Sequence, residues 1–130
     1  ALSEVKIGLV PATISPYVIA AIGERYAKRY FMTAERFDGN TALQMSLVHE
    51  TVEEQQLDKK IEQLVTSILS NGPEAVVAAK QLISKVSGEV IDSTLIEHTC
   101  EVIAGIRVST QGQEGLSAFL GKRKPNWLKD

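Results

Sequence analysis

A stripe of apolar residues in the middle of the chain limits the fold more than any other feature of the sequence. The stripe has the spacing i, i+3, i+4, i+7 and i+8, and its members are Ile61, Leu64, Val65, Ile68 and Leu69. This spacing puts all of them on one face of an α-helix, whereas a strand would divide them between its two faces. Asn71-Gly72 predicts the end of that helix, and Pro73 predicts the first turn of the next. The sequence therefore predicts a helical second half.

The other helices are predicted from turn and capping residues. In the first half we expect helices at three places: 16–22 with Gly23 as its end, 24–32, and 39–45 with Asp38 as its N-cap. In the second half we expect three more: Pro73 to Val86, a long helix with Ile91, Leu95, Val102 and Ile106 along one side, and a last helix in which Thr110 and Gln113 have capping-box spacing.

Two short segments predict strands. Val5, Ile7 and Leu9 alternate with less apolar residues within 4–10, and residues 47–50 are expected to be extended. Two lone strands form only a marginal sheet, so we expect another chain or a further segment to pair with them. The expected fold class is mostly α with one or two short strands.

Composition and charge exclude several classes of protein. The 130 residues are 44% hydrophobic and 23% charged, which is typical of a single soluble globular unit. The net charge of −2 argues against binding to nucleic acid or to an anionic membrane surface. No apolar run approaches the roughly 18 residues of a membrane span. With no signal-peptide pattern and a single cysteine, Cys100, we expect a cytoplasmic protein.

Glu4 opens the apolar run from Val5 to Pro11, directly before the loop 12–16. A carboxyl group at the edge of a buried strand can act as a general acid or base. The alternative is an acid that only faces solvent at the end of a strand. Because the first residues already have the pattern of a protein interior and no Met begins the sequence, we expect the chain to be a piece of an enzyme.

No residue pattern predicts a metal site. His49-Glu50 is not followed by a second histidine four residues after the first, since position 53 is Glu53. His98 and Cys100 lie two residues apart, which places them on different faces of a helix. We therefore expect neither a metal ion nor a redox cofactor.

Three basic residues, Lys122-Arg123-Lys124, follow the last expected helix. Basic residues at this position complement the helix dipole and require no ligand. The same residues can also form ion pairs with a phosphate-bearing ligand. The residues alone leave both interpretations open.

Four segments of the chain match motifs that occur together in one protein family. The chain opens with Ser3-Glu4-Val5-Lys6-Ile7-Gly8-Leu9-Val10-Pro11 and closes with Gln113-Glu114-Gly115-Leu116-x-Ala118-Phe119-x-x-Lys122-Arg123-x-Pro125. Between these motifs come Phe37-Asp38 through Leu47-Val48-His49-Glu50, then Gly72-Pro73 with Ala79-Lys80. Together, in this order and spacing, they resemble the enoyl-CoA hydratase/isomerase family, the crotonase superfamily.

The resemblance implies that the chain is the C-terminal half of an α/β crotonase fold, a spiral of ββα turns. Residues 1–52 would then be the C-terminal end of the spiral core. Residues 53–130 would be a helical region for oligomer formation and for covering the CoA site. Family members are trimers or dimers of trimers, so a homo-oligomer is expected. Their oxyanion hole and first catalytic glutamate lie in the N-terminal half, and coenzyme A enters only as part of the substrate.

The resemblance also implies roles for individual residues. Glu4 matches the family's second catalytic glutamate, which donates a proton at the α-carbon. Ala12 falls where a glycine N–H helps to hold the attacking water, and the amide is retained. Lys122 matches the lysine that reaches a phosphate of CoA, and Phe119 of the same motif is assigned with it to substrate binding.

The loop after Pro11 departs from the family pattern. Most members have a glycine-rich turn where this chain has Ala12-Thr13-Ile14-Ser15-Pro16-Tyr17, so we expect an altered acyl pocket. This loop resembles most that of the methylglutaconyl-CoA and isohexenylglutaconyl-CoA hydratases of leucine and terpene breakdown. Ser15 or Tyr17 is then expected to hold a distal carboxylate of the substrate. The alternative is that Ser15 only caps the helix opened by Pro16.

Three functions follow from the resemblance and the residues. The first is part of a hydratase that adds water across the 2,3 double bond of an enoyl-CoA thioester. The second is an isomerase of the same superfamily, in which Glu4 moves a proton, and the third is a non-catalytic assembly fragment. The expected partner is an acyl-CoA thioester, with no nucleic acid and no membrane. Because no oxyanion hole is found in the sequence, the isolated 130 residues are expected to be inactive.

Overall fold

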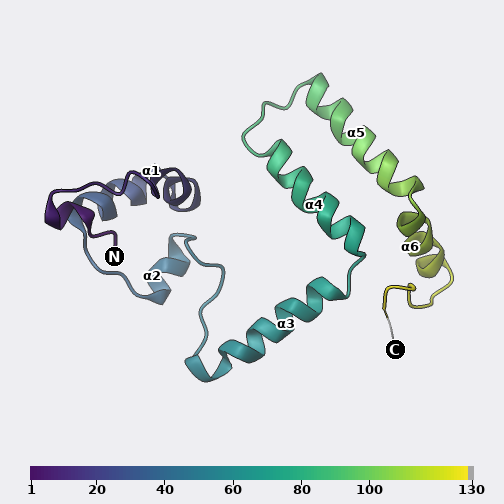
Figure 1. Ribbon diagram of the computed structural model, residues 1–130, viewed down its shortest axis with the longest axis horizontal. Helices are drawn as coiled ribbons and strands as arrows, with labels where there is room; N and C mark the ends of the chain where they lie inside the picture. The colour runs from purple at the N-terminus through teal and green to yellow at the C-terminus, as the bar shows by residue number, and fades with distance from the viewer. Residues whose placement is uncertain (129–130) are drawn as a thin grey trace. The chain divides into compact units, whose positions relative to one another are not determined.

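The computed structural model describes residues 1–128, and all of its regular elements are helices (Figure 1). The chain divides into two compact units, Ala1–Leu57 and the residues from Asp58 onward. None of the helices described is both long and apolar enough to cross a membrane.

The first unit contains two α-helices and two short 3₁₀-helices. These are η1 (Glu4–Ile7), α1 (Ser15–Thr33), α2 (Gly39–Gln44) and η2 (Glu54–Gln56). Its core contains five buried residues: Ile22, Ala27, Tyr30, Ala42 and Met45. The rings of Tyr30 and Phe37 pack edge to face with their centroids 5.1 Å apart. Residues from α1 and α2 therefore share one small apolar core.

Two turn and capping predictions are confirmed in this unit. Gly23 has φ +73° and ψ 163°, so it interrupts α1 where the sequence predicts the end of a helix. Only glycine adopts this conformation readily, because it has no Cβ. Asp38 caps α2, since its carboxylate accepts a hydrogen bond of 2.8 Å from the Thr41 N–H. This hydrogen bond lowers the pKa of Asp38.

The two predicted strands are wrong within the described part of the chain. Glu4–Ile7 forms η1, and Gly8 ends it with φ +77°. Residues 47–49 form bends, because the N–H groups of Leu47 and Val48 donate back to the Ala42 carbonyl at 2.9 and 3.4 Å. A strand requires a neighbour for its backbone hydrogen bonds, and residues 1–128 contain no strand that could pair with either segment. The prediction of a mostly helical chain is confirmed.

The second unit is built from helices, as predicted, but Ile91 lies outside the long helix in which it was predicted, because Asp92 caps that helix and Ser93 is its first residue. The helices are α3 (Leu57–Leu69), α4 (Pro73–Val86), α5 (Ser93–Val108) and α6 (Thr110–Leu120). The bounds predicted for α4 are confirmed. The cap of α6 is Ser109 rather than Thr110, since the Ser109 hydroxyl accepts from the Gly112 N–H at 3.0 Å. The α4, α5 and α6 helices contact one another.

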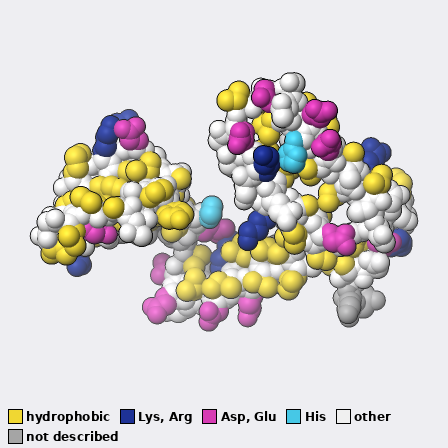
Figure 2. Space-filling model, turned by 45° about the horizontal axis from the view of Figure 1, so that its top comes forward, with side chains coloured by type: hydrophobic (Ala, Val, Ile, Leu, Met, Phe, Trp, Pro, Cys, Tyr) yellow, Lys and Arg dark blue, Asp and Glu magenta, His cyan; other side chains and the backbone are white. Residues whose placement is uncertain are grey.

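The apolar stripe of α3 is helical, as predicted, but it is not covered. Its five side chains are 47–70% exposed, and Figure 2 shows hydrophobic side chains in a row along this helix. In the described part of the second unit, Ala118 is the one buried hydrophobic residue. The stripe has the pattern of a buried helix face without the neighbour that would bury it.

Candidate functional site

Glu4 is held in a turn that closes on itself. The N–H of Lys6 donates to the Ser3 carbonyl at 3.0 Å, and the N–H of Leu9 donates to the Glu4 carbonyl at 3.0 Å. Gly8 permits this reversal of the backbone because it has no Cβ and adopts a φ of +77° without the strain that other residues would have. Glu4 therefore begins a hydrogen-bonded turn of the backbone that contacts α1.

The carboxyl group of Glu4 has an unusual environment. Its Oε2 atom is shielded from solvent and has no hydrogen-bond partner among the described residues. Buried polar atoms are rarely left unpaired, because desolvation without a hydrogen bond costs about 1–3 kcal/mol. Such an atom points to a catalytic role or to a hydrogen-bond donor supplied by another molecule.

The polar groups of the following loop are paired with each other. The Ala12 N–H donates to the Val10 carbonyl at 2.8 Å. The Ser15 hydroxyl donates to the Ala12 carbonyl at 2.9 Å, and the Ser15 N–H reaches the same oxygen at 3.3 Å. Ser15 is the first residue of α1, whose N-cap is Ile14. The alternative that Ser15 only caps this helix is therefore wrong, because Ser15 is not the N-cap and its hydroxyl bonds to the preceding loop.

The predicted site residues are divided between the two units. Glu4, Ala12, Ser15 and Tyr17 belong to the first unit, in which the Tyr17 side chain is 78% exposed on α1. Phe119 belongs to the second unit and is 80% exposed on α6. Four of the predicted residues thus lie within one short stretch of η1, loop and α1.

Lys122 and Arg123 have different environments although they are neighbours. Lys122 is exposed, has φ +49°, and its ammonium makes no hydrogen bond or ion pair with residues 1–128. The Arg123 guanidinium donates to both carboxylate oxygens of Glu114, from Nη1 at 2.6 Å and from Nη2 at 2.8 Å. A bidentate pair of this kind is among the strongest charged contacts of a protein surface. Arg123 is therefore occupied, and Lys122 is available to an anion.

Glu114 is a residue whose role the sequence patterns did not indicate. Besides Arg123, its Oε1 accepts a hydrogen bond of 2.9 Å from the Asn126 N–H, and its side chain is only 19% exposed. The hydrogen bond from Arg123, followed by that from Asn126, lowers the pKa of Glu114 to about 2. Glu114 and Arg123 lie nine residues apart across the end of a helix, so no helical spacing relates them.

Replacement of Glu114 by glutamine should change how stability depends on pH. The folded-state pKa of about 2 lies below the ordinary value of 4.5, so folding favours the charged form. The carboxylate therefore stabilises the fold above pH 4.5, and this contribution is lost as the pH falls toward 2. Melting temperatures followed by the fluorescence of Trp127, the single tryptophan, should differ at pH 6 and converge near pH 2. A constant difference down to pH 2 would contradict the assignment.

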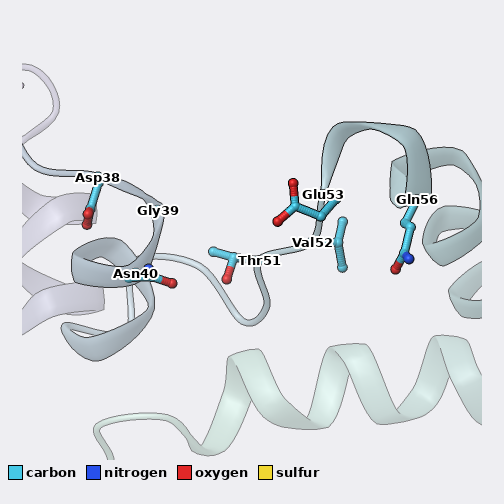
Figure 3. Close-up of a pocket in the computed structure, with 7 residues that line it drawn as sticks. All are labelled: Asp38, Gly39, Asn40, Thr51, Val52, Glu53 and Gln56. Carbon is cyan, nitrogen blue, oxygen red and sulfur yellow. The ribbon is translucent and has the colours of Figure 1, made fainter.

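A polar pocket of about 430 Å³ lies in the first unit, away from the predicted residues. Figure 3 shows side chains from the start of α2 and from the segment that leads into η2. The lining residues are Asp38, Gly39, Asn40, Thr51, Val52, Glu53 and Gln56. Asp38 already serves as the cap of α2, so its carboxylate has a structural role. This pocket contains none of the predicted site residues.

A smaller cavity of about 220 Å³ in the second unit is mainly structural. It lies beside the N-terminus of α4 and is lined by Gln111, Leu116 and Trp127, among others. The Gln111 Oε1 atom accepts hydrogen bonds from the N–H groups of Glu74 at 2.9 Å and Ala75 at 3.2 Å. The Gln111 side chain thus caps α4 from a distant part of the sequence. Among the described residues, no three His, Cys, Asp or Glu side chains lie close enough together to hold a metal ion.

Two solved structures are similar to this chain over almost its whole length. A Legionella pneumophila structure assigned as an enoyl-CoA hydratase/isomerase (crotonase) is 49% identical, with a TM-score of 0.91 over 97% of this chain and 49% of that chain. An enoyl-CoA hydratase structure from Shewanella pealeana is 48% identical, with a TM-score of 0.89 over 97% of this chain and 47% of that one. The helices described here are therefore those of a crotonase fold.

A curated relative and a family model agree with the structures. The short-chain-enoyl-CoA hydratase of Clostridium acetobutylicum is 30% identical over 129 residues, which cover 98% of this chain and 49% of that protein. The chain thus spans about half the length of the curated relatives that it matches. The family model for enoyl-CoA hydratase/isomerase matches residues 1–130. The chain belongs to the enoyl-CoA hydratase/isomerase family.

Proposed function

We propose that the chain is the C-terminal part of an enoyl-CoA hydratase in which Glu4 performs acid–base chemistry. The observation that carries the proposal is the shielded Oε2 atom of Glu4, which has no partner among residues 1–128. A carboxyl oxygen that is shielded from solvent and has no partner among these residues leaves a site at which a substrate can meet a general acid or base.

The reaction adds one water molecule to the substrate. The water oxygen bonds to C3 of the enoyl thioester and loses one proton to a basic carboxylate, which we propose lies in the part of the protein that this chain does not span. The double bond becomes a single bond, C2 receives a proton from Glu4, and the proton taken from water restores Glu4. Negative charge develops on the thioester oxygen, and backbone N–H donors would stabilise it in the part of the protein that this chain does not span. No electron leaves the substrate, so the proposed reaction needs only acid–base groups and coenzyme A as part of the substrate.

We further propose a substrate of the methylglutaconyl-CoA type, as in leucine or terpene breakdown. The loop before α1 places side chains where a glycine-rich turn would have none, and Tyr17 is exposed in the first turn of α1. Its hydroxyl can donate a hydrogen bond to a distal carboxylate. The Ser15 hydroxyl can join only if it leaves the Ala12 carbonyl. Ala12 would offer its N–H to water in the same way, by release from Val10.

The second unit supplies the proposed contact with the nucleotide end of the substrate. Lys122 would pair with a phosphate of CoA, and Phe119 would offer an exposed ring to the ligand. We propose residues 53–130 as the region that covers CoA and forms a trimer or a dimer of trimers. The uncovered stripe of α3 supports association with other polypeptide. We place the protein in the cytoplasm.

A hybrid enzyme tests the proposed function. In it, these 130 residues replace the segment of the Legionella pneumophila protein that they match, at 49% identity. We expect the hybrid to hydrate crotonyl-CoA and to act on 3-methylglutaconyl-CoA with a higher kcat/KM, measured by loss of the enoyl thioester and by product analysis. The isolated chain should show no turnover.

Two proteins serve as controls in the same assay. The unaltered Legionella protein shows what its own sequence contributes, and the Clostridium acetobutylicum hydratase shows that hydration is detected. If a folded hybrid only shifts the double bond of the substrate, the proposed activity is that of an isomerase and not of a hydratase. A folded hybrid that binds acyl-CoA without changing it would contradict both activities and favour an assembly role.

A further inference from the structure

The backbone at Lys122 has a conformation that side chains disfavour. Its φ of +49° lies in the left-handed region, where the Cβ of an L-residue approaches the following carbonyl. Two backbone hydrogen bonds close the end of α6 at this point. The Lys122 N–H donates to the Phe119 carbonyl at 3.2 Å, and the Arg123 N–H donates to the Ala118 carbonyl at 3.0 Å.

The segment after Lys122 is tied to α6 by the Glu114 carboxylate. This carboxylate accepts hydrogen bonds from Nη1 and Nη2 of Arg123 at 2.6 and 2.8 Å, and from the Asn126 N–H at 2.9 Å. The Arg123 guanidinium makes two further contacts: Nη1 to the Lys124 carbonyl at 3.1 Å and Nη2 to the Ser117 hydroxyl at 3.4 Å. Lys122 thus lies between the end of α6 and Arg123, which Glu114 anchors from nine residues before Arg123.

We propose that Glu114, acting through Arg123 and Asn126, is a positioning residue that directs Lys122 toward a phosphate of coenzyme A. The inference rests on the proposed function. Since Glu114 already neutralises Arg123, the cation that remains available at this turn is Lys122. Without Glu114, the left-handed turn loses its anchor, and the ammonium samples many directions. Fixing a long side chain before binding lowers the entropy cost of the contact.

Binding of coenzyme A to the 130-residue chain tests the inference in a double-mutant cycle. The variants are Glu114→Gln, Lys122→Met and the two together, and titration calorimetry gives the dissociation constants. Each single change should weaken binding about tenfold, as expected for loss of one charged contact. The double variant should bind no more weakly than Lys122→Met, because Glu114 acts through Lys122. Pantetheine, which lacks the nucleotide phosphates, should bind all variants equally.

A matched control separates positioning from general stability. Glu35→Gln removes another bidentate pair, in which Glu35 accepts from the Arg29 Nε and Nη2 atoms in the first unit. We expect this variant to bind coenzyme A as the unaltered chain does. The melting temperature of each variant shows how much stability is lost.

Several outcomes would overturn the inference. If Lys122→Met weakens binding and Glu114→Gln does not, Glu114 has no positioning role, while the proposed function stands. If Glu114→Gln weakens pantetheine binding equally, its role is structural. If Lys122→Met has no effect, or if the unaltered chain does not bind coenzyme A, the assignment of Lys122 fails together with the inference. Turnover by the hybrid enzyme is a separate measurement, and it tests the proposed function without testing the role of Glu114.

Discussion

Glu4→Gln should lower the kcat of the hybrid enzyme by about 10²–10⁴-fold, the range expected for loss of a general acid or base. Glutamine has nearly the same shape as glutamate, so the turn around it should persist. Its amide cannot transfer a proton at the pH of the reaction. Affinity for a saturated acyl-CoA, which binds without reacting, should change by less than about twofold, since Glu4 acts on the transition state rather than on the bound thioester.

A second acid of the same unit provides the control for this prediction. Glu24 is 74% exposed and pairs with Lys28 at 2.6 Å on α1. Exposed pairs of this kind contribute little, so Glu24→Gln should leave kcat and affinity unchanged. Turnover of Glu4→Gln at the rate of the unaltered hybrid would remove Glu4 from the mechanism. Equal losses of turnover and of binding would instead show that the substitution damages the fold.

Gly112→Ala should destabilise the second unit by about 3 kcal/mol, near the upper end of the usual cost of overpacking. A Cβ on Gly112 would lie 2.1 Å from the backbone carbonyl oxygen of Ile106, in the last turn of α5. A backbone atom cannot turn aside as a side chain can. The junction of α5 and α6 must therefore open. This opening also strains the hydrogen bond that the Gly112 N–H donates to the Ser109 hydroxyl at the N-cap of α6. Urea unfolding followed by Trp127 fluorescence measures the loss.

Gly105→Ala is the matched control, and its effect should have the opposite sign. Gly105 lies within α5, and nothing comes within 4 Å of a Cβ placed on it. Alanine is preferred to glycine in a helix by about 1 kcal/mol, so this variant should be more stable than the unaltered chain. If both alanine substitutions change stability by the same amount, the close approach of Gly112 to Ile106 is not the cause.

The helices were predictable because their limits depend on nearby residues. Pro73 begins α4 and Asp38 caps α2 through contacts within a few positions in the sequence. The segment 4–10 shows the opposite case. Its alternation predicts a strand, but a strand depends on a partner from elsewhere, and among the residues described here none exists. Local signals thus predicted the helices, whereas the strands did not form because each needs a pairing partner from elsewhere in the chain.

The candidate site was predictable only in part. Motifs single out Glu4 and Lys122, but the sequence cannot show that the Oε2 atom of Glu4 is shielded and unpaired. Nor does it show that Arg123 is occupied by Glu114, because this contact joins a helix to the segment after it. Contacts of this kind depend on how the chain turns back, and helical or strand periodicity contains no information on that turn.

The uncovered stripe of α3 has a thermodynamic consequence for the whole molecule. Its five side chains remain 47–70% exposed in the folded chain. A polypeptide that covers the stripe binds the folded form and not the unfolded one, so it raises the free energy of unfolding by mass action. At a concentration of one hundred times its dissociation constant, the gain is about 2.7 kcal/mol. The melting temperature of this chain should therefore rise with the concentration of whatever binds α3.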